Sequence, residues 1–146
     1  MEKKEIKPRS DCPVSFCMDN FGDKWTLLIM RDMILDGKST FGEFLNSKEG
    51  IATNILTDRL KMLESEGFIL KYPISGKART GYCPTEKGIT LIPIIIEISL
   101  WGAAQGYTGQ REEFGKQLKK DKPGVMKKLA ADLKKRYNAA QKEAAL

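Results

Sequence analysis

Residues 51–71, IATNILTDRLKMLESEGFILK, decide the fold of this 146-residue chain. Their apolar residues fall at Ile55, Leu56, Leu60 and Leu63, which is the spacing of one buried helix face. Gly67 is the kind of residue that ends a helix. The opposite face carries short hydrogen-bonding side chains and one cation near the helix start, namely Thr53, Asn54, Thr57, Asp58 and Lys61.

The next segment, FILKYPISGKARTGYCP at 68–84, predicts two short strands around a basic turn. It holds Lys71, Lys77 and Arg79 and no acid. A helix that starts with small polar groups can read a major groove, and a basic hairpin beside it can reach the adjacent minor groove or backbone. Together they predict a winged helix. The alternative, from residues 51–71 alone, is an ordinary amphipathic helix with a solvated polar face.

Upstream, the sequence predicts helices at 12–20, 24–35 and 41–46. Pro13 suits a first helical position, and Thr40 with Glu43 has the spacing of a capping box. The helix at 41–46 and the helix at 51–66 are separated by the turn SKEG, a helix-turn-helix spacing. The nearest cap position for the second helix is Ala52, a poor cap, and Thr53 is the alternative.

Downstream, residues 85–101 predict one helix that is apolar almost all round and kinked at Pro93. Such a helix needs more cover than its own core supplies, which favours a second copy of the chain as partner; the alternative is a central core helix in a monomer. After a glycine-rich break at 102–109, a further helix is expected at 125–143. Its apolar stripe favours packing on the dimer or the body over a basic arm on flanking DNA.

The composition is that of a soluble globular protein, with 41% hydrophobic and 30% charged residues. The apolar run at 91–100 is too short to span a bilayer, and no leader opens the chain, so we expect a cytoplasmic protein without membrane contact. Three cysteines fit a reducing compartment.

The positive charge is unevenly distributed along the chain. The formal net charge is +6, and residues 111–146 hold eleven Lys/Arg and five Asp/Glu, so residues 1–110 are neutral overall. Any attraction of the body for DNA must therefore come from local charge, such as the turn at 68–84.

Catalysis has no support in the sequence. The chain has no histidine, no GxxxxGK[ST], no GxGxxG and no CxxC, which removes histidine-based nucleophilic catalysis and the usual phosphate and redox motifs. We expect a protein that is not an enzyme, with no cofactor and no metal. A thiol enzyme built on Cys12 would lack a partner base.

Several motifs in order resemble the HxlR-type winged-helix regulators, which are related to the MarR-like superfamily. They are CPV (12–14), GDKWTLLIMRDM (22–33), FGEF (41–44), ILTDRLKMLESEGFI (55–69), TEKGITLIPII (85–95) and the pair Trp101 and Gly102. The resemblance covers about residues 12–102 and implies a dimeric DNA-binding transcription factor.

The resemblance also implies roles for single residues. LTDRL aligns with the family's LTxRL, which places Thr57 and Arg59 on the recognition helix. Arg59 lies near the buried boundary and holds either a phosphate or an internal acid. Ala52 stands where the family has a serine cap, Asp58 adds a negative charge beside DNA, and Pro84 replaces a strand leucine, so that the second strand should end early.

Cys12 is a candidate thiol sensor, because some members of the family sense oxidants through the cysteine of the CPV motif. A thiol at a helix N-terminus lies near unpaired N–H groups that favour thiolate, although Asp11 opposes this. The alternative is a small buried cysteine without reactivity. Cys17 is too far along the helix for an easy bridge, so a disulfide would join two subunits or a small thiol.

Taken together, the sequence predicts a mainly α fold with a small β wing, a winged helix-turn-helix with added dimerisation helices. We expect a flexible segment at 1–11, a DNA-binding and dimerisation domain at 12–102 and a basic helical extension at 103–146.

The expected function is transcription regulation, as a repressor that binds palindromic promoter DNA as a homodimer. The two copies are expected to meet through the N-terminal helix, the 85–101 helix and the C-terminal helices. A small-molecule effector is an option that no residue specifies. The alternative is a winged-helix module for protein–protein assembly. The predicted DNA-binding residues are Thr53, Asn54, Thr57, Asp58, Arg59, Lys61, Lys77 and Arg79.

Overall fold

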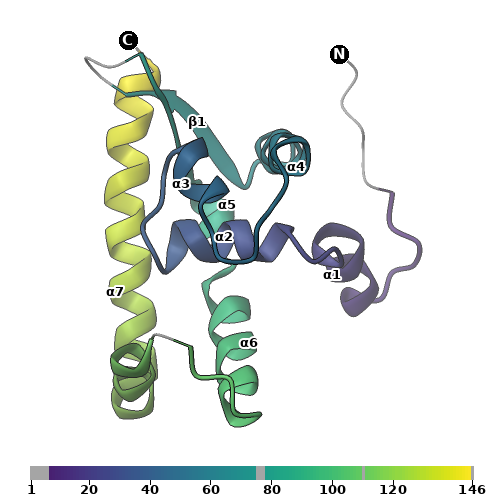
Figure 1. The fold of residues 1–146 in the computed structure, drawn as a ribbon, viewed down its shortest axis with the longest axis vertical. Helices are drawn as coiled ribbons and strands as arrows, with labels where there is room; N and C mark the ends of the chain where they lie inside the picture. The colour runs from purple at the N-terminus through teal and green to yellow at the C-terminus, as the bar shows by residue number, and fades with distance from the viewer. Residues whose placement is uncertain (1–6, 75–77, 110, 146) are drawn as a thin grey trace.

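The computed structural model describes residues 7–74, 78–109 and 111–145. Figure 1 shows helices arranged around a short β-hairpin, with a long C-terminal helix along one side. The elements in chain order are α1 (Pro13–Phe21), α2 (Thr26–Ile34), α3 (Phe41–Leu45), α4 (Thr53–Ser65), β1 (Ile69–Pro73), β2 (Thr80–Pro84), α5 (Glu86–Ile89), α6 (Ile92–Ala104) and α7 (Glu112–Ala144). A mainly helical chain with one small sheet confirms the predicted fold class.

The core lies where α2, α3, α4 and α6 meet. Its fully buried side chains include Met30, Met33, Phe44, Leu56 and Ile96. The stripe predicted for residues 51–71 is confirmed at Leu56, Leu60 and Leu63, which are buried on α4, while Ile55 is half-buried. This burial fixes which face of α4 remains outside.

The structure shows which residues cap the N-termini of α3 and α4. The Thr40 hydroxyl accepts a hydrogen bond from the Glu43 N–H and the Glu43 carboxylate accepts one from the Thr40 N–H, so the predicted capping box is present. At α4 the cap residue is Ala52, in an extended conformation and with no side-chain hydrogen bond. Thr53 is therefore the first helical residue and not the cap.

The hairpin is antiparallel, with Ile69 opposite Pro84 and Tyr72 opposite Gly81. Pro84 is the last residue of β2, as predicted from its missing donor. The Ile74 N–H donates to the Arg79 carbonyl oxygen at 2.9 Å and continues the pairing toward the turn.

The single kinked helix predicted at 85–101 is wrong. The segment forms two helices, α5 and α6, separated at Thr90 and Leu91. Pro93 lies in the first turn of α6, where its missing N–H costs no hydrogen bond, so it helps to begin a helix instead of kinking one. Residues 86–104 are long and apolar enough to cross a membrane by length and composition alone, but the break at Thr90 and Leu91 divides them into two helices, and Ile92, Ile95 and Ile96 are buried in the core.

The helix predicted at 125–143 is present as the second segment of α7, after a break at Asp121, whereas the first segment, which begins at Glu112, was not predicted. The helix is interrupted at Asp121, which has non-helical backbone angles, and the Asp121 carboxylate accepts a hydrogen bond from the Gly124 N–H at 3.1 Å. Asp121 therefore caps a second helical segment in which Pro123 is tolerated near the start. The α7 helix contacts α5, α6 and both strands, which agrees with the packing favoured for the C-terminal stripe.

Candidate nucleic-acid interface

The outward face of α4 is polar. Thr53, Asn54, Asp58 and Lys61 are exposed, and Thr57 is half-buried. The Thr57 hydroxyl donates to the Thr53 carbonyl oxygen one turn earlier, at 2.9 Å. Asn54 and Lys61 lie on the side of α4 left free by the buried stripe, so both offer donors to solvent.

Arg59 makes two ion pairs inside the protein. Its Nε donates to Asp23 at 3.0 Å and its Nη1 to Asp58 at 2.6 Å. Of the two roles considered for Arg59, pairing with an internal acid is the one present in this structure. The bond to Asp23 joins α4 to the turn before α2, so Arg59 acts as a positioning residue for α4.

Asp23 is the centre of that joint. Its carboxylate also accepts hydrogen bonds from the N–H groups of Trp25 and Thr26 and from the Thr26 hydroxyl. Burial raises the pKa of Asp23, but the hydrogen bonds from Thr26, Trp25 and Arg59 together lower it below its ordinary value. The same carboxylate thus fixes the start of α2 and the orientation of α4. Sequence reasoning missed this residue, although the GDKW segment places an acid three residues before the first residue of α2, which is a capping signal.

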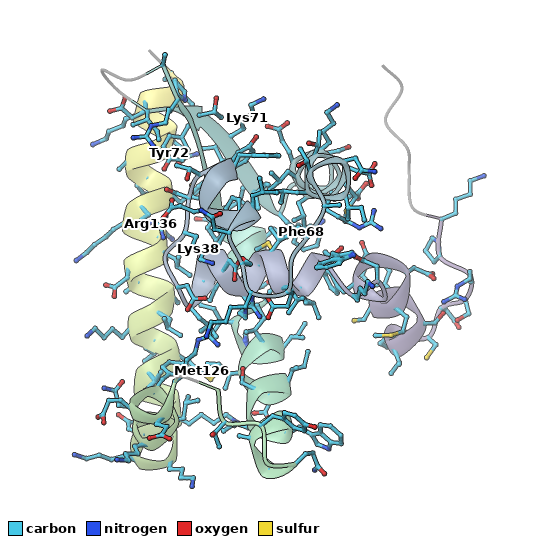
Figure 2. All side chains as sticks on the ribbon, in the orientation of Figure 1. Lys38, Phe68, Lys71, Tyr72, Met126 and Arg136 are labelled. Atoms are coloured by element: carbon cyan, nitrogen blue, oxygen red, sulfur yellow. The ribbon has the colours of Figure 1, made fainter. Side chains whose placement is uncertain are left out.

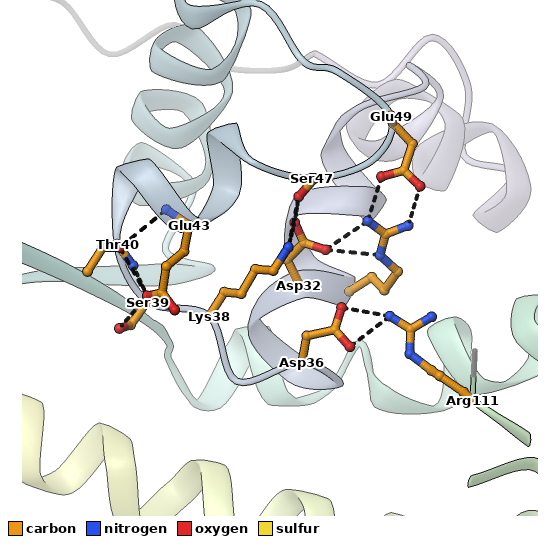
Figure 3. A network of polar contacts seen from close by, with 10 residues as sticks. Asp32, Asp36, Lys38, Ser39, Thr40, Glu43, Ser47, Glu49 and Arg111 are labelled. Atoms are coloured by element: carbon orange, nitrogen blue, oxygen red, sulfur yellow. Dashed lines mark hydrogen bonds and ion pairs between the residues drawn. The ribbon is translucent and has the colours of Figure 1, made fainter. Parts of the chain in front are cut away.

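A polar network holds the loop between α3 and α4 (Figure 3). Arg31 donates to both carboxylate oxygens of Glu49, at 3.0 and 2.8 Å, and also to the buried Asp32 at 2.7 Å. Ser47 donates to Asp32 and receives a hydrogen bond from Lys38. The hydrogen bonds from Arg31 lower the pKa of Glu49 to about 2. Because this loop leads directly into α4, the network fixes where α4 begins.

A small cleft of about 110 Å³ separates α4 from the hairpin. Lys61 and Thr57 line it from α4, and Lys71 lines it from β1. Glu64 also lines the cleft, so its two lysines and one carboxylate leave a single net positive charge, which suits one phosphate oxygen of a nucleic-acid backbone. Lys71 belongs to the basic segment at 68–84 but was not among the predicted DNA-binding residues. Because neighbouring residues of a strand point to opposite faces of the sheet, Lys71 faces α4 while Tyr72 faces the other side.

The wing turn is described in part. Arg79 is exposed and lies immediately before the first residue of β2. Lys77 and Gly76 lie outside the described residues, so the role assigned to Lys77 stays a prediction.

The three cysteines lie in different environments. Cys12 is exposed at the cap position of α1, Cys17 is half-buried and Cys83 is buried in the sheet. The alternative of a buried Cys12 is therefore wrong, because the cap residue of α1 lies at the protein surface. Burial raises the pKa of the Cys83 thiol to about 11, so Cys83 stays a neutral thiol at physiological pH.

Comparisons with known proteins identify the family of this chain. Residues 20–110 match the model of the HxlR-like helix-turn-helix family. The uncharacterised HTH-type transcriptional regulator YybR of Bacillus subtilis is 37% identical over 69% of this chain and 82% of its own length.

Solved structures of transcription regulators also superpose on this chain. The redox regulator HypR in its oxidised form superposes with a TM-score of 0.57 and 34% identity over 64% of this chain and 96% of its own. The transcriptional regulator YodB from B. subtilis, in its reduced form, has a TM-score of 0.52 and 26% identity over 64% and 92%. The chain with the polar α4 face, the basic hairpin and the helix-turn-helix core described above belongs to the HxlR-like helix-turn-helix family of transcription regulators.

Proposed function

We propose that this protein is a homodimeric transcription regulator that binds palindromic promoter DNA and represses by occupying it. The observation that carries the proposal is the exposed polar face of α4 beside a cleft lined by Lys61 and Lys71. In this arrangement Thr53, Asn54, Thr57 and Asp58 face base edges in a major groove. Lys61, Lys71, Arg79 and Lys77 hold the backbone or the neighbouring minor groove. Arg59 holds α4 in place through Asp23.

The homodimer is supported by apolar side chains that the single chain leaves in water. On α6, Ile98 is 54% and Trp101 71% exposed; on α1, Val14 is 68% and Phe16 50% exposed. A soluble monomer seldom exposes so many large apolar side chains on two helices, and a two-fold partner would cover the same patch on each copy. Two recognition helices related by such an axis match two half-sites about one or two helical turns apart.

Selection of bound genomic fragments tests the proposal. The wild-type protein should enrich a palindrome, and Thr57→Ala should lose sequence preference while it still binds DNA. Lys71→Ala should weaken binding to all sequences about equally, because a phosphate contact carries no sequence information. Failure of the wild-type protein to bind duplex DNA of any sequence at low ionic strength would contradict the proposal.

The rival function is a winged-helix module for protein–protein assembly without direct DNA contact. The neutral charge of residues 1–110 favours it. The salt dependence of binding distinguishes the two functions. Protein binding releases counterions from DNA, so affinity for DNA falls steeply as salt rises, whereas affinity at an apolar protein interface changes little.

Oxidant sensing by Cys12 is a second candidate function, favoured by the exposure of Cys12 at the start of α1. The helix that follows also carries the exposed Val14 and Phe16, so a modified thiol would alter the surface proposed for dimer contact. Diamide should release DNA from the wild-type protein and from Cys83→Ser but not from Cys12→Ser. Equal release from Cys12→Ser would refute the sensor.

A further inference from the structure

The end of α6 and the first segment of α7 leave a cleft between them. The cleft has a volume of about 400 Å³, which is within the range of small-molecule sites. In Figure 1 the two helices run side by side at one end of the molecule, and they contact each other. The family model covers residues 20–110, whereas α7 begins at Glu112. One wall of the cleft is therefore built by a segment that the family model does not include.

The wall on α6 continues the buried face of that helix. Ile96, Leu100 and Ala103 have the spacing i, i+4 and i+7, so they share one face. Ile96 is fully buried, and Leu100 and Ala103, which are half-buried, line the cleft. Ile98 and Trp101 are each two residues from a member of this stripe, which is roughly 200° around a helix of 3.6 residues per turn. The cleft therefore lies on the opposite side of α6 from the surface proposed for dimer contact.

The inner wall on α7 is apolar. Phe114 and Leu118 lie one helical turn apart on the first segment, and both line the cleft. Leu118 is buried and Phe114 is half-buried, and both pack on the core. Further along α7, Met126 lies between α7 and α6 (Figure 2) and also packs on the core. A ligand in the cleft would thus meet apolar side chains from both helices.

Gly115 keeps this wall open. It lies in the lining of the cleft, one residue after Phe114 and inside a helical segment. A Cβ at Gly115 would meet no atom within 4 Å, so close packing does not require glycine at this position. Glycine inside a helix is destabilising relative to alanine, because it loses more conformational freedom on folding. This position therefore gives up helix stability and leaves space in the cleft.

The charged side chains of the cleft are mostly cations. Arg111, Lys116 and Lys119 line it. One acid, Glu112, also lines it, so three cations and one acid leave a net charge of +2. Arg111 is already paired with Asp36, at 2.8 and 2.7 Å, whereas no ion pair among the described residues engages Lys116 or Lys119. The two lysines lie one helical turn apart, so both can reach one anionic group at the edge of the apolar wall.

We propose that this cleft binds a small carboxylic acid with an apolar body. The body lies between Leu100 and Phe114, and the carboxylate is held by Lys116 and Lys119. Burial of the apolar body and charge-assisted hydrogen bonds to the carboxylate both favour binding. This site does not depend on DNA binding by α4. The competing explanation is a water-filled cleft whose lysines are only solvated.

Isothermal titration calorimetry tests the site with two acids, octanoate and 2-naphthoate, and with the neutral amide of each. Gly115→Leu places a side chain in the cleft, and Gly115→Ala is its matched control, because a single methyl group leaves most of the space free. Lys116→Gln with Lys119→Gln removes the two cations. Lys127→Gln with Lys128→Gln, at exposed positions of α7 outside the lining of the cleft, makes the same change of charge. Circular dichroism melting checks that every variant remains folded.

At least one acid should bind the wild-type protein, and its amide should bind about tenfold more weakly, because the amide lacks charge-assisted hydrogen bonds. Gly115→Leu should weaken binding of the acid by about tenfold or more, whereas Gly115→Ala should change it by less than about threefold. Loss of both cleft lysines should weaken binding by about tenfold, and the variant at Lys127 and Lys128 should follow the wild type.

Three results would overturn the site: neither acid binds the wild-type protein, the amides bind as tightly as the acids, or folded Gly115→Leu binds as the wild type does. Equal weakening by the two double lysine variants would overturn the place assigned to the carboxylate. None of these outcomes bears on DNA binding by α4, so the proposed function is tested separately.

Discussion

The helices α4 and α6 have the same length of 13 residues, and each buries three apolar residues in one core. They differ in what they leave outside. The free face of α4 carries Asn54, Asp58 and Lys61, whereas the free face of α6 carries Ile94, Ile98 and Trp101. Burial of one face gives each helix its place in the fold, and the chemistry of the other face determines its partner. A polar free face suits base edges and phosphates, and an apolar free face suits a second protein surface.

The buried faces of the two helices should matter equally for stability. Leu56 of α4 and Ile96 of α6 are both fully buried. We expect Leu56→Ala and Ile96→Ala each to lower the free energy of unfolding by about 2 to 5 kcal/mol, because each leaves a cavity in a packed core. Urea denaturation measures both. A loss below about 1 kcal/mol for either variant would contradict the tight packing of that side chain in the core.

The free face of α6 should govern self-association. Trp101→Glu places a charge in the proposed seam and should weaken the dimer by about 2 to 4 kcal/mol, as expected for a central aromatic anchor. Sedimentation velocity over a range of protein concentrations measures this. Gln117→Glu, an equal charge change at an exposed position of α7, should sediment as the wild type does.

The free face of α4 should govern DNA binding without changing stability. Asn54 is exposed, and Asn54→Ala should reduce affinity for the selected duplex by about 1 to 3 kcal/mol through loss of a base contact. Fluorescence anisotropy measures the loss, and Ser65→Ala at the other end of α4 is the matched control. If the two variants bind alike, the start of α4 does not read bases.

A better N-cap on α4 should stabilise the fold, by less than the changes described above. Ala52 supplies no side-chain hydrogen bond to the first turn of α4. Ala52→Ser should raise the free energy of unfolding by about 0.5 to 1 kcal/mol, since a serine oxygen can accept a free N–H there. Thermal unfolding measures the gain, and Ala52→Gly, which lacks the oxygen, should not reproduce all of it.

The smallest effect concerns the loop that leads into α4. The hydrogen bonds from Arg31 hold the folded-state pKa of Glu49 at about 2, below its ordinary 4.5. A depressed pKa stabilises the fold above the unfolded value, and the contribution is lost as pH falls from 4.5 toward 2. Glu49→Gln should therefore show a shallower fall in Tm over this range than the wild type. Identical profiles would mean that this half-exposed pair contributes no measurable stability.

Local patterns in the sequence predicted those parts of the fold that depend on neighbours along the chain. The capping box of Thr40 and Glu43, the buried stripe of α4 and the end of β2 at Pro84 are all present, because each is set within a few residues. Pro93 was misread as a kink, since its effect depends on whether a new helix starts at that point, and the break at Thr90 and Leu91 carries no strong signal. Asp121 and Pro123 carried a capping signal for the second segment of α7, and the first segment, from Glu112, was not predicted.

The candidate site divides in the same way. The outward position of Asn54 and Lys61 followed from helical periodicity alone. The partner of Arg59 could not be predicted from periodicity, because Asp23 lies 36 residues away in the sequence and meets Arg59 only through tertiary packing. Lys71 was visible as a charge, but its place in a cleft with Lys61 required the sheet and α4 to be positioned together.

The contacts of α7 have a mechanical consequence. One segment of this helix is tied to α6 through Lys122 and Glu97, and a later segment rests on the strands beside Tyr72. The α7 helix therefore links α6 to the hairpin. A rotation of α6 must therefore either move the hairpin as well or break the contacts of α7 with α6 or with the strands.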